Sequence, residues 1–324
     1  MSAERAVVLL AGKVHPRVRE RVEAEFEAVS VDTADITALS EETRNRISGL
    51  AAATRISAEF IDSLPNLEVI ANFGVGYDAV DAAHAATRNV MVTNTPDVLS
   101  DEVADTTIGL LLNTLRELPK AEAYLRAGRW AAEGGYPLTS LSLRGRTAGI
   151  YGLGRIGLAI AQRLEAFGLP IHYHTRTQRS DVAYTWHPRL VDMASAVDIL
   201  VVIVPGGAET EKTVNADILN ALGPQGVLIN VGRGSTVDEP ALIAALADRT
   251  IAAAGLDVFA DEPNVPQALM DLPNACLLPH VASASVATRN AMADLVVDNL
   301  TEWLAGRPAV TPVPECAGFD RASG

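Results

Sequence analysis

Apolar positions along this chain follow two different periodicities, which alternate from one short segment to the next. Compact apolar runs, typical of buried strands, stand at Ala6–Ala11, Ala51–Arg55, Leu67–Phe73, Val90–Thr93, Ala148–Tyr151, Ile171–His174, Ala196–Val204, Val227–Gly232, Ala252–Phe259 and Ala275–Pro279. Helical spacing of apolar residues is found around Val18–Phe26, Glu41–Leu50, Phe60–Leu64, Asp81–Arg88, Ser100–Leu125, Ile156–Phe167, Glu239–Ala247 and Ser285–Leu304. Strands that alternate with helices indicate parallel sheets, so the pattern predicts an α/β fold.

The clearest unit in this pattern has a glycine-rich turn between its first strand and its helix. The turn reads Gly152-Leu153-Gly154-Arg155-Ile156-Gly157. Gly152 permits a tight turn, Gly154 lets backbone approach a pyrophosphate, and Gly157 lets the helix pack closely on the strand. The N–H groups at the start of the helix favour an anion. The segment therefore predicts a dinucleotide site.

The end of the next strand indicates which dinucleotide binds. A carboxylate there would hold the ribose hydroxyl of NAD, but the segment after His174 has none before Asp181. Arg176, with Arg179 behind it and the Thr175 hydroxyl beside it, suits a 2′-phosphate instead. We therefore predict NADP. If these arginines are only a solvated loop, either cofactor binds, and NAD is the alternative.

The order of the elements predicts two domains. The alternation breaks at Thr93–Asp97, and the final long helix should lead the chain back to the first domain. We predict a substrate domain at 1–98 and 286–324, and a dinucleotide-binding domain at 99–285. Both should be doubly wound parallel sheets, flavodoxin-like and Rossmann respectively, with ligands beyond the carboxyl ends of the strands. The expected site is the cleft between the domains. The irregular arm at 128–143 fits either a partner surface or its own domain.

Composition narrows the classes of partner. The net charge is −14, which argues against nucleic acid or an acidic membrane surface as a partner. The two cysteines, Cys276 and Cys316, suggest neither a metal site nor a disulfide framework. No stretch is long enough to span a membrane, and the N-terminus is typical of a strand rather than a signal peptide. We expect a cytoplasmic protein.

Three polar residues follow predicted strands of the dinucleotide domain, and together they form a coherent chemical set. Arg233 could bind the carboxylate of a 2-oxo acid and polarise its ketone. His280 could protonate the alkoxide that hydride transfer leaves, and Glu262 would orient that imidazole. Each residue also has a structural alternative: a loop bridge for Arg233, a turn cap for Glu262 and a core imidazole for His280.

Several further motifs bear on this set. They are Asn72-Phe73-Gly74-Val75-Gly76-Tyr77-Asp78, Thr95-Pro96-Asp97-Val98-Leu99-Ser100, Asn230-Val231-Gly232-Arg233-Gly234, Gly255-Leu256-Asp257-Val258-Phe259 and Leu278-Pro279-His280. With the glycine turn, and in this order, they make the chain resemble the D-isomer-specific 2-hydroxyacid dehydrogenases. Within that family it looks most like the glyoxylate/hydroxypyruvate reductases that prefer NADPH.

The resemblance carries expectations for individual residues. It implies Arg233, Glu262 and His280 as the catalytic set, and a homodimer built through the cofactor domains. It implies substrate contacts, which are expected at Val75, Gly76, Arg233 and Ser283. It also implies cofactor contacts, which are expected at Gly152, Leu153, Gly154, Arg155, Ile156, Thr175, Arg176, Arg179, Val204, Pro205, Thr210, Val231, Arg233, Asp257 and His280.

Two other functions stay open at this stage. One is an NAD-linked dehydrogenase of a bulkier D-2-hydroxy acid, because the arm that would shape the substrate pocket cannot be aligned. The other is a non-catalytic dinucleotide sensor, like the transcriptional corepressors that resemble this family. Turnover of glyoxylate with NADPH would separate a reductase from a sensor.

Overall fold

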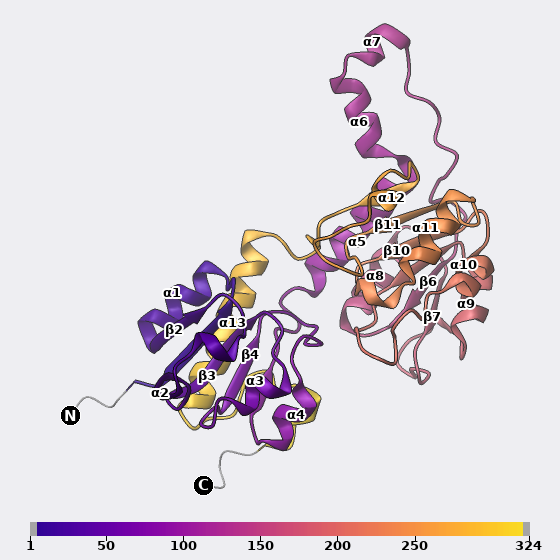
Figure 1. Cartoon of the computed structure of the whole chain (residues 1–324). Helices are drawn as coiled ribbons and strands as arrows, with labels where there is room; N and C mark the ends of the chain where they lie inside the picture. The colour runs from indigo at the N-terminus through magenta and orange to yellow at the C-terminus, as the bar shows by residue number, and fades with distance from the viewer. Residues whose placement is uncertain (1–4, 320–324) are drawn as a thin grey trace. The chain divides into compact units, whose positions relative to one another are not determined.

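The chain divides into two compact units, each with its own parallel sheet (Figure 1). The computed structural model describes residues 5–319. Unit 1 comprises Met1–Leu99 and Ser285–Gly324, and unit 2 comprises Ser100–Ala284. The predicted boundaries differ from these by one residue. It stays a prediction that one unit binds substrate and the other binds cofactor, with a cleft between them.

Unit 1 is built on a five-stranded sheet in the order β2-β1-β3-β4-β5, with every pair parallel. Its strands are β1 (Val7–Gly12), β2 (Glu27–Val31), β3 (Ile47–Ala53), β4 (Val69–Asn72) and β5 (Met91–Thr93). Its α-helices are α1 (Pro16–Glu25), α2 (Glu41–Arg44), α3 (Ala58–Asp62), α4 (Ala82–Thr87) and α13 (Val286–Leu304). This strand order is that of flavodoxin-like sheets, as predicted. The closing helix α13 packs against α1, where Arg17 and Asp294 form an ion pair at 2.7 Å.

Unit 2 is built on a seven-stranded parallel sheet in the order β12-β11-β10-β9-β6-β7-β8. Its strands are β6 (Ala148–Tyr151), β7 (Ile171–His174), β8 (Thr185–Trp186), β9 (Ile199–Val202), β10 (Val227–Asn230), β11 (Ala253–Leu256) and β12 (Ala275–Leu277). Its α-helices are α5 (Ser100–Arg116), α6 (Leu118–Arg126), α7 (Arg129–Glu133), α8 (Arg155–Ala166), α9 (Leu190–Ala196), α10 (Ala216–Leu222), α11 (Glu239–Ala247) and α12 (Gln267–Met270). The order reverses between β6 and β9, as in a Rossmann sheet. The predicted α/β class is confirmed.

Two predicted helices are wrong in extent. The helix expected over Glu41–Leu50 ends at Arg44, and β3 begins at Ile47. Gly49 explains the difference, because a Cβ there would lie 3.1 Å from a methyl of Leu304, so the position suits a strand under a closely packed helix. The helix expected over Ser100–Leu125 breaks at Glu117, whose φ of 50° is left-handed, and α6 then begins at Leu118 with Pro119 in its first turn.

Candidate active site

The glycine turn lies where the order of the unit 2 sheet reverses, at the carboxyl end of β6. Gly152 has a φ of +102°, and a Cβ there would lie 2.9 Å from the carbonyl oxygen of Ile203. A Cβ at Gly157 would lie 2.1 Å from the carbonyl oxygen of Gly152, so α8 could not pack as closely with any larger residue. Gly154 precedes α8 and faces open space. These features fit a pyrophosphate above the helix N-terminus, which is the role predicted for the turn.

The loop after β7, which we expect to contact the cofactor ribose, contains Arg176 and Arg179. These two arginines make different contacts. Arg179 is engaged within the protein: its Nη1 donates to the carbonyl oxygen of Leu153 at 2.6 Å, and its Nε donates to Asp181 at 2.9 Å. The side chain of Arg176 is 89% exposed. It forms an ion pair with Glu209 at 3.0 Å, in which both side chains are open to solvent. Arg176 is therefore the arginine that can reorient toward a ligand, and Arg179 ties the loop to the turn. The sequence pattern did not reveal Glu209, which follows a different strand.

The remaining predicted cofactor residues line the same end of the sheet. Val204 lies against the turn, since its Cγ1 would be 2.9 Å from a Cβ at Gly152. Thr210 donates from its hydroxyl to the carbonyl oxygen of Pro205 at 2.6 Å, which shapes the loop after β9. Thr175 donates in the same way to Thr177, at 2.7 Å. Their cofactor contacts stay predictions.

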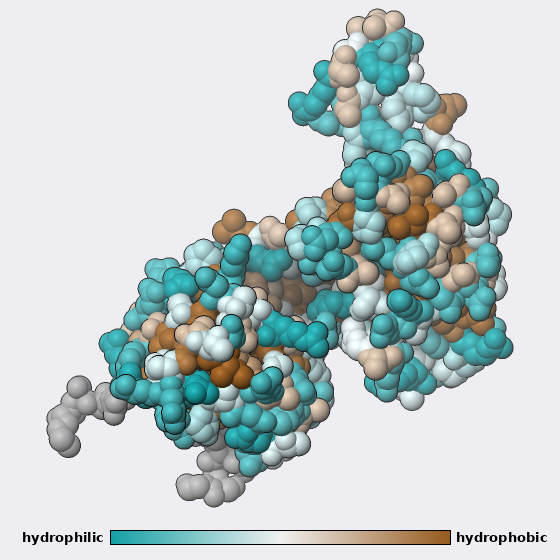
Figure 2. All heavy atoms as spheres, in the orientation of Figure 1, coloured by the Kyte–Doolittle hydropathy of each residue, from teal (hydrophilic) through white to brown (hydrophobic). Residues whose placement is uncertain are grey.

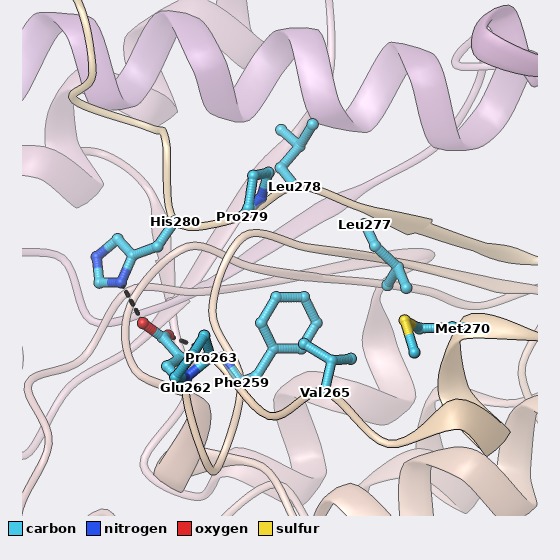
Figure 3. A pocket seen from close by; sticks show the side chains of 9 residues that line it. All are labelled: Phe259, Glu262, Pro263, Val265, Met270, Leu277, Leu278, Pro279 and His280. Carbon is cyan, nitrogen blue, oxygen red and sulfur yellow. Dashed lines mark hydrogen bonds and ion pairs between the residues drawn. The ribbon is translucent and has the colours of Figure 1, made fainter.

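The predicted catalytic residues follow three neighbouring strands, β10, β11 and β12. His280 and Glu262 are paired, with 2.7 Å between the Nδ1 atom and the Oε2 atom (Figure 3). The other oxygen of Glu262 accepts the backbone N–H of Phe259 at 3.0 Å. Because the carboxyl ends of parallel strands share one edge of the sheet, the three side chains are brought to the same region.

Electrostatics support an ionised Glu262. Burial works to raise the pKa of its carboxyl group, but hydrogen bonds from His280 and the Phe259 N–H, together with the charge of Arg233, outweigh it. The pKa of Glu262 therefore lies below its ordinary value. Arg233 is half-buried and donates from its Nη1 atom to the carbonyl oxygen of Gly232 at 2.9 Å. An ionised carboxylate at Nδ1 leaves the Nε2 edge of His280 to face a substrate.

Asp257, which the family resemblance places on the nicotinamide carboxamide, is hydrogen-bonded to the backbone of its own unit. The residue is fully buried, and its two carboxylate oxygens accept the N–H groups of Val281 and Ala282 at 2.7 and 2.9 Å. Burial raises the pKa of this carboxyl group, against the lowering effect of those two N–H groups. Val231 and Ser283 are buried in the same unit.

The predicted carboxylate-binding loop lies in unit 1, at the end of β4. Its carbonyl oxygens are held: Asn72 donates to those of Gly74 and Gly76 at 3.2 and 3.1 Å, and Asn94 donates to that of Val75 at 2.8 Å. Within residues 5–319, no acceptor is bonded to the N–H of Val75 or of Gly76. The loop therefore offers two backbone N–H donors, and its carbonyl oxygens are bonded by Asn72 and Asn94, which the motif alone did not single out.

An apolar pocket lies beside the imidazole–carboxylate pair in unit 2. It has a volume of about 260 Å³ and is lined by Phe259, Glu262, Pro263, Val265, Met270, Leu277, Leu278, Pro279 and His280 (Figure 3). Figure 2 shows apolar surface near α12, the helix that contributes Met270 to this lining. Met270 is 49% exposed there. Sequence patterns did not indicate this pocket, because its lining is scattered over loops and short elements.

The predicted irregular arm is partly helical and internally braced. Tyr124 and Tyr136 meet edge to face at 5.4 Å, and the guanidinium of Arg129 lies 4.6 Å from the Tyr124 ring centre. Exposed apolar side chains lie on the arm, at Trp130 and Leu138, and on the preceding helix α6, at Leu118 and Leu125. A braced arm with an uncovered apolar face suits contact with another surface.

Two negative findings limit other chemistry within the described part of the chain. No group of three or more His, Cys, Asp or Glu side chains is arranged to hold a metal ion. No helix there has the length and apolarity needed to cross a membrane.

The chain is similar to several known proteins. The family model described as "D-isomer specific 2-hydroxyacid dehydrogenase, NAD binding domain" matches residues 108–282. The hydroxyphenylpyruvate reductase of Plectranthus scutellarioides is 48% identical over 86% of this chain and 88% of its own length. The glyoxylate/hydroxypyruvate reductase A of Arabidopsis thaliana is 48% identical over 85% of this chain and 88% of its own.

A solved structure extends the similarity to the whole fold. It is an NADPH-dependent glyoxylate/hydroxypyruvate reductase from Sinorhizobium meliloti, in complex with NADP and malonate. It is 62% identical, covers 97% of this chain and 98% of its own, and gives a TM-score of 0.95.

Proposed function

Because this chain belongs to the family of D-isomer-specific 2-hydroxyacid dehydrogenases, we propose that it uses NADPH to reduce a small 2-oxo acid to the D-2-hydroxy acid. Glyoxylate and hydroxypyruvate are the substrates that the named relatives support best. The observation that carries the proposal is the pair formed by His280 and Glu262, with Arg233 close enough to lower the pKa of that glutamate.

The residues have separate tasks in the proposed reaction. NADPH, when bound at the glycine turn, would supply a hydride for the ketone carbon. Arg233 binds the substrate carboxylate and draws electron density toward the ketone oxygen. Glu262, as an ionised acceptor at Nδ1, fixes the imidazole ring, so that His280 carries the transferable proton on Nε2. His280 gives this proton to the alkoxide that forms as the hydride arrives.

The substrate carboxylate has a second set of donors in the proposal. The N–H groups of Val75 and Gly76 suit a carboxylate, since their loop carbonyls are held by Asn72 and Asn94. Ser283 belongs to the same proposed substrate site. Two adjacent backbone donors of this kind favour a substrate that carries a carboxylate.

The glycine turn and Arg176 carry the proposed choice of cofactor. The open face of Gly154 and the N-terminus of α8 accept the pyrophosphate. Arg176 turns from Glu209 to the 2′-phosphate, which costs little because an exposed ion pair is weak. Leu153, Arg155, Ile156 and Thr210 complete the proposed cofactor site. NADH lacks the phosphate and is the poorer cofactor in this account.

We further propose that the protein is a cytoplasmic homodimer, with the arm of each copy laid on the cofactor unit of the other. The apolar surface for this contact comes from the exposed Trp130 and Leu138 of the arm and from Leu125 of the adjoining helix α6. The paired substitution Trp130→Ala and Leu138→Ala should shift sedimentation from dimer to monomer. A wild-type monomer, or a doubly substituted dimer of unchanged affinity, would contradict this part of the proposal.

A bulkier substrate has one specific observation in its favour. The apolar pocket beside His280 offers about 260 Å³, and one relative is named for an aromatic 2-oxo acid. Initial rates with NADPH and NADH on glyoxylate, hydroxypyruvate and 4-hydroxyphenylpyruvate test both proposals. The principal proposal expects the highest kcat/KM with NADPH and a small acid. A preference for NADH and the aromatic acid would replace it with the alternative, and absence of turnover would favour the sensor.

A further inference from the structure

We propose that Asp257 positions His280 for proton transfer by holding the backbone segment that carries the imidazole. The inference rests on the proposed function, in which His280 is the proton donor. It gives Asp257 a task separate from any contact with the nicotinamide. The evidence is a set of hydrogen bonds that join one buried residue to three consecutive amides.

The contacts of Asp257 cover the whole turn after β12. Its backbone carbonyl oxygen accepts the N–H of His280 at 2.9 Å. Its carboxylate oxygens accept the next two N–H groups, those of Val281 and Ala282, at 2.7 and 2.9 Å. Hydrogen bonds from N–H groups to a carboxylate are stronger than those to a neutral oxygen, and more so away from water.

The turn needs such a hold because His280 has an unfavourable backbone conformation. Its φ is +54°, in the left-handed region that costs free energy for any residue with a Cβ. Asp257 is itself fixed to the sheet, since its N–H donates to the carbonyl oxygen of Asn230 at 3.0 Å. Through Asp257, the turn that carries His280 is hydrogen-bonded to the carboxyl ends of β10 and β11. Arg233 and Glu262 follow these same two strands.

The positioning role and a nicotinamide contact predict different kinetics. A lost nicotinamide contact weakens NADPH binding. A lost hold on the turn leaves NADPH binding intact and lowers kcat, because the imidazole leaves its position beside Glu262. Misplacement of a reacting group by about 1 Å costs on the order of 100-fold in rate.

Asp257→Asn is the first variant, because it keeps the size but replaces one acceptor oxygen with a donor. We expect kcat for hydroxypyruvate to fall about 100-fold, with the NADPH Kd within about threefold of wild type. The double variant Asp257→Asn with His280→Ala should turn over as slowly as His280→Ala alone. The inference would be overturned if the losses in kcat of the two single variants multiplied in the double variant. It would also be overturned if the NADPH Kd of Asp257→Asn rose as much as its kcat fell.

Amide hydrogen exchange gives a readout that does not need turnover. In the cofactor-free protein, Asp257→Asn should speed exchange at Val281 and Ala282, and unchanged exchange there would also overturn the inference. Asp198→Asn is the matched control: it makes the same substitution in unit 2 at a carboxylate that accepts the N–H of Thr147 at 2.8 Å, at the amino end of the sheet, and it should leave exchange at both amides and kcat unchanged. If Asp257→Asn does not fold, Asp257→Glu replaces it, with both oxygens displaced by one methylene. If the wild-type protein shows no turnover, the proposed function is refuted. The exchange rates at Val281 and Ala282 would still show whether Asp257 holds the turn.

Discussion

Replacing Arg176 with aspartate tests the proposed recognition of the 2′-phosphate. The side chain is 89% exposed and its partner Glu209 is 79% exposed, so little native structure depends on the pair. A hydrogen bond to a charged group contributes about 1.5 kcal/mol at the lower end of its range, which is about tenfold in Kd. An aspartate adds repulsion from the phosphate, about 1 kcal/mol at roughly 6 Å in water, or about a further fivefold.

Arg176→Asp should therefore raise the NADPH Kd roughly 50-fold and leave the NADH Kd within about twofold. Isothermal titration at low and high salt measures both constants, and the NADPH effect should shrink as salt screens the charges. Arg189→Asp is the matched control, because it makes the same charge change at another exposed arginine of unit 2. Equal weakening of NADPH and NADH, or an effect as large in Arg189→Asp, would refute the reasoning.

Three further predictions address other parts of the structure. His280→Ala should lower kcat at least about 100-fold while NADPH binding stays nearly unchanged; a wild-type rate would exclude His280 as the proton donor. Gly157→Ala should destabilise the protein by about 3 kcal/mol or more in thermal unfolding, because its Cβ would meet the Gly152 carbonyl at 2.1 Å; an unchanged melting temperature would contradict the packing argument. The hydrogen bond from Arg17 holds the pKa of Asp294 below its ordinary value, so this carboxylate stabilises the protein above about pH 4 and ceases to do so as pH falls through the lowered pKa. Asp294→Asn should cost about 0.5–1 kcal/mol at pH 7, and this difference from wild type should vanish in acid; a difference independent of pH would contradict the assignment.

Much of the fold could be predicted because strand and helix periods alternate clearly around Gly152–Gly157. The apolar runs also located the strands before Arg233, Glu262 and His280. The helix prediction over Glu41–Leu50 failed because apolar residues at helical spacing also fill a strand buried on both faces, and only the contact of Gly49 with Leu304 distinguishes them. The edge strands β2 and β8 lack apolar runs, so the pattern gave no signal for them.

The site was predictable in its residue types and less so in its partners. Two details depend on loop conformations, which the spacing of apolar residues does not predict. One is which oxygen of Glu262 bonds to His280, and the other is that Asp257 accepts three backbone N–H groups. Arg176 and Glu209 lie 33 positions apart and meet only because β7 and β9 flank β6.

The most direct test of the central claim is the product formed from hydroxypyruvate and NADPH by the wild-type protein. The account predicts one D-glycerate for each NADPH oxidised, with a kcat/KM well above that for NADH. Formation of L-glycerate, or no oxidation of NADPH by any 2-oxo acid, would contradict it.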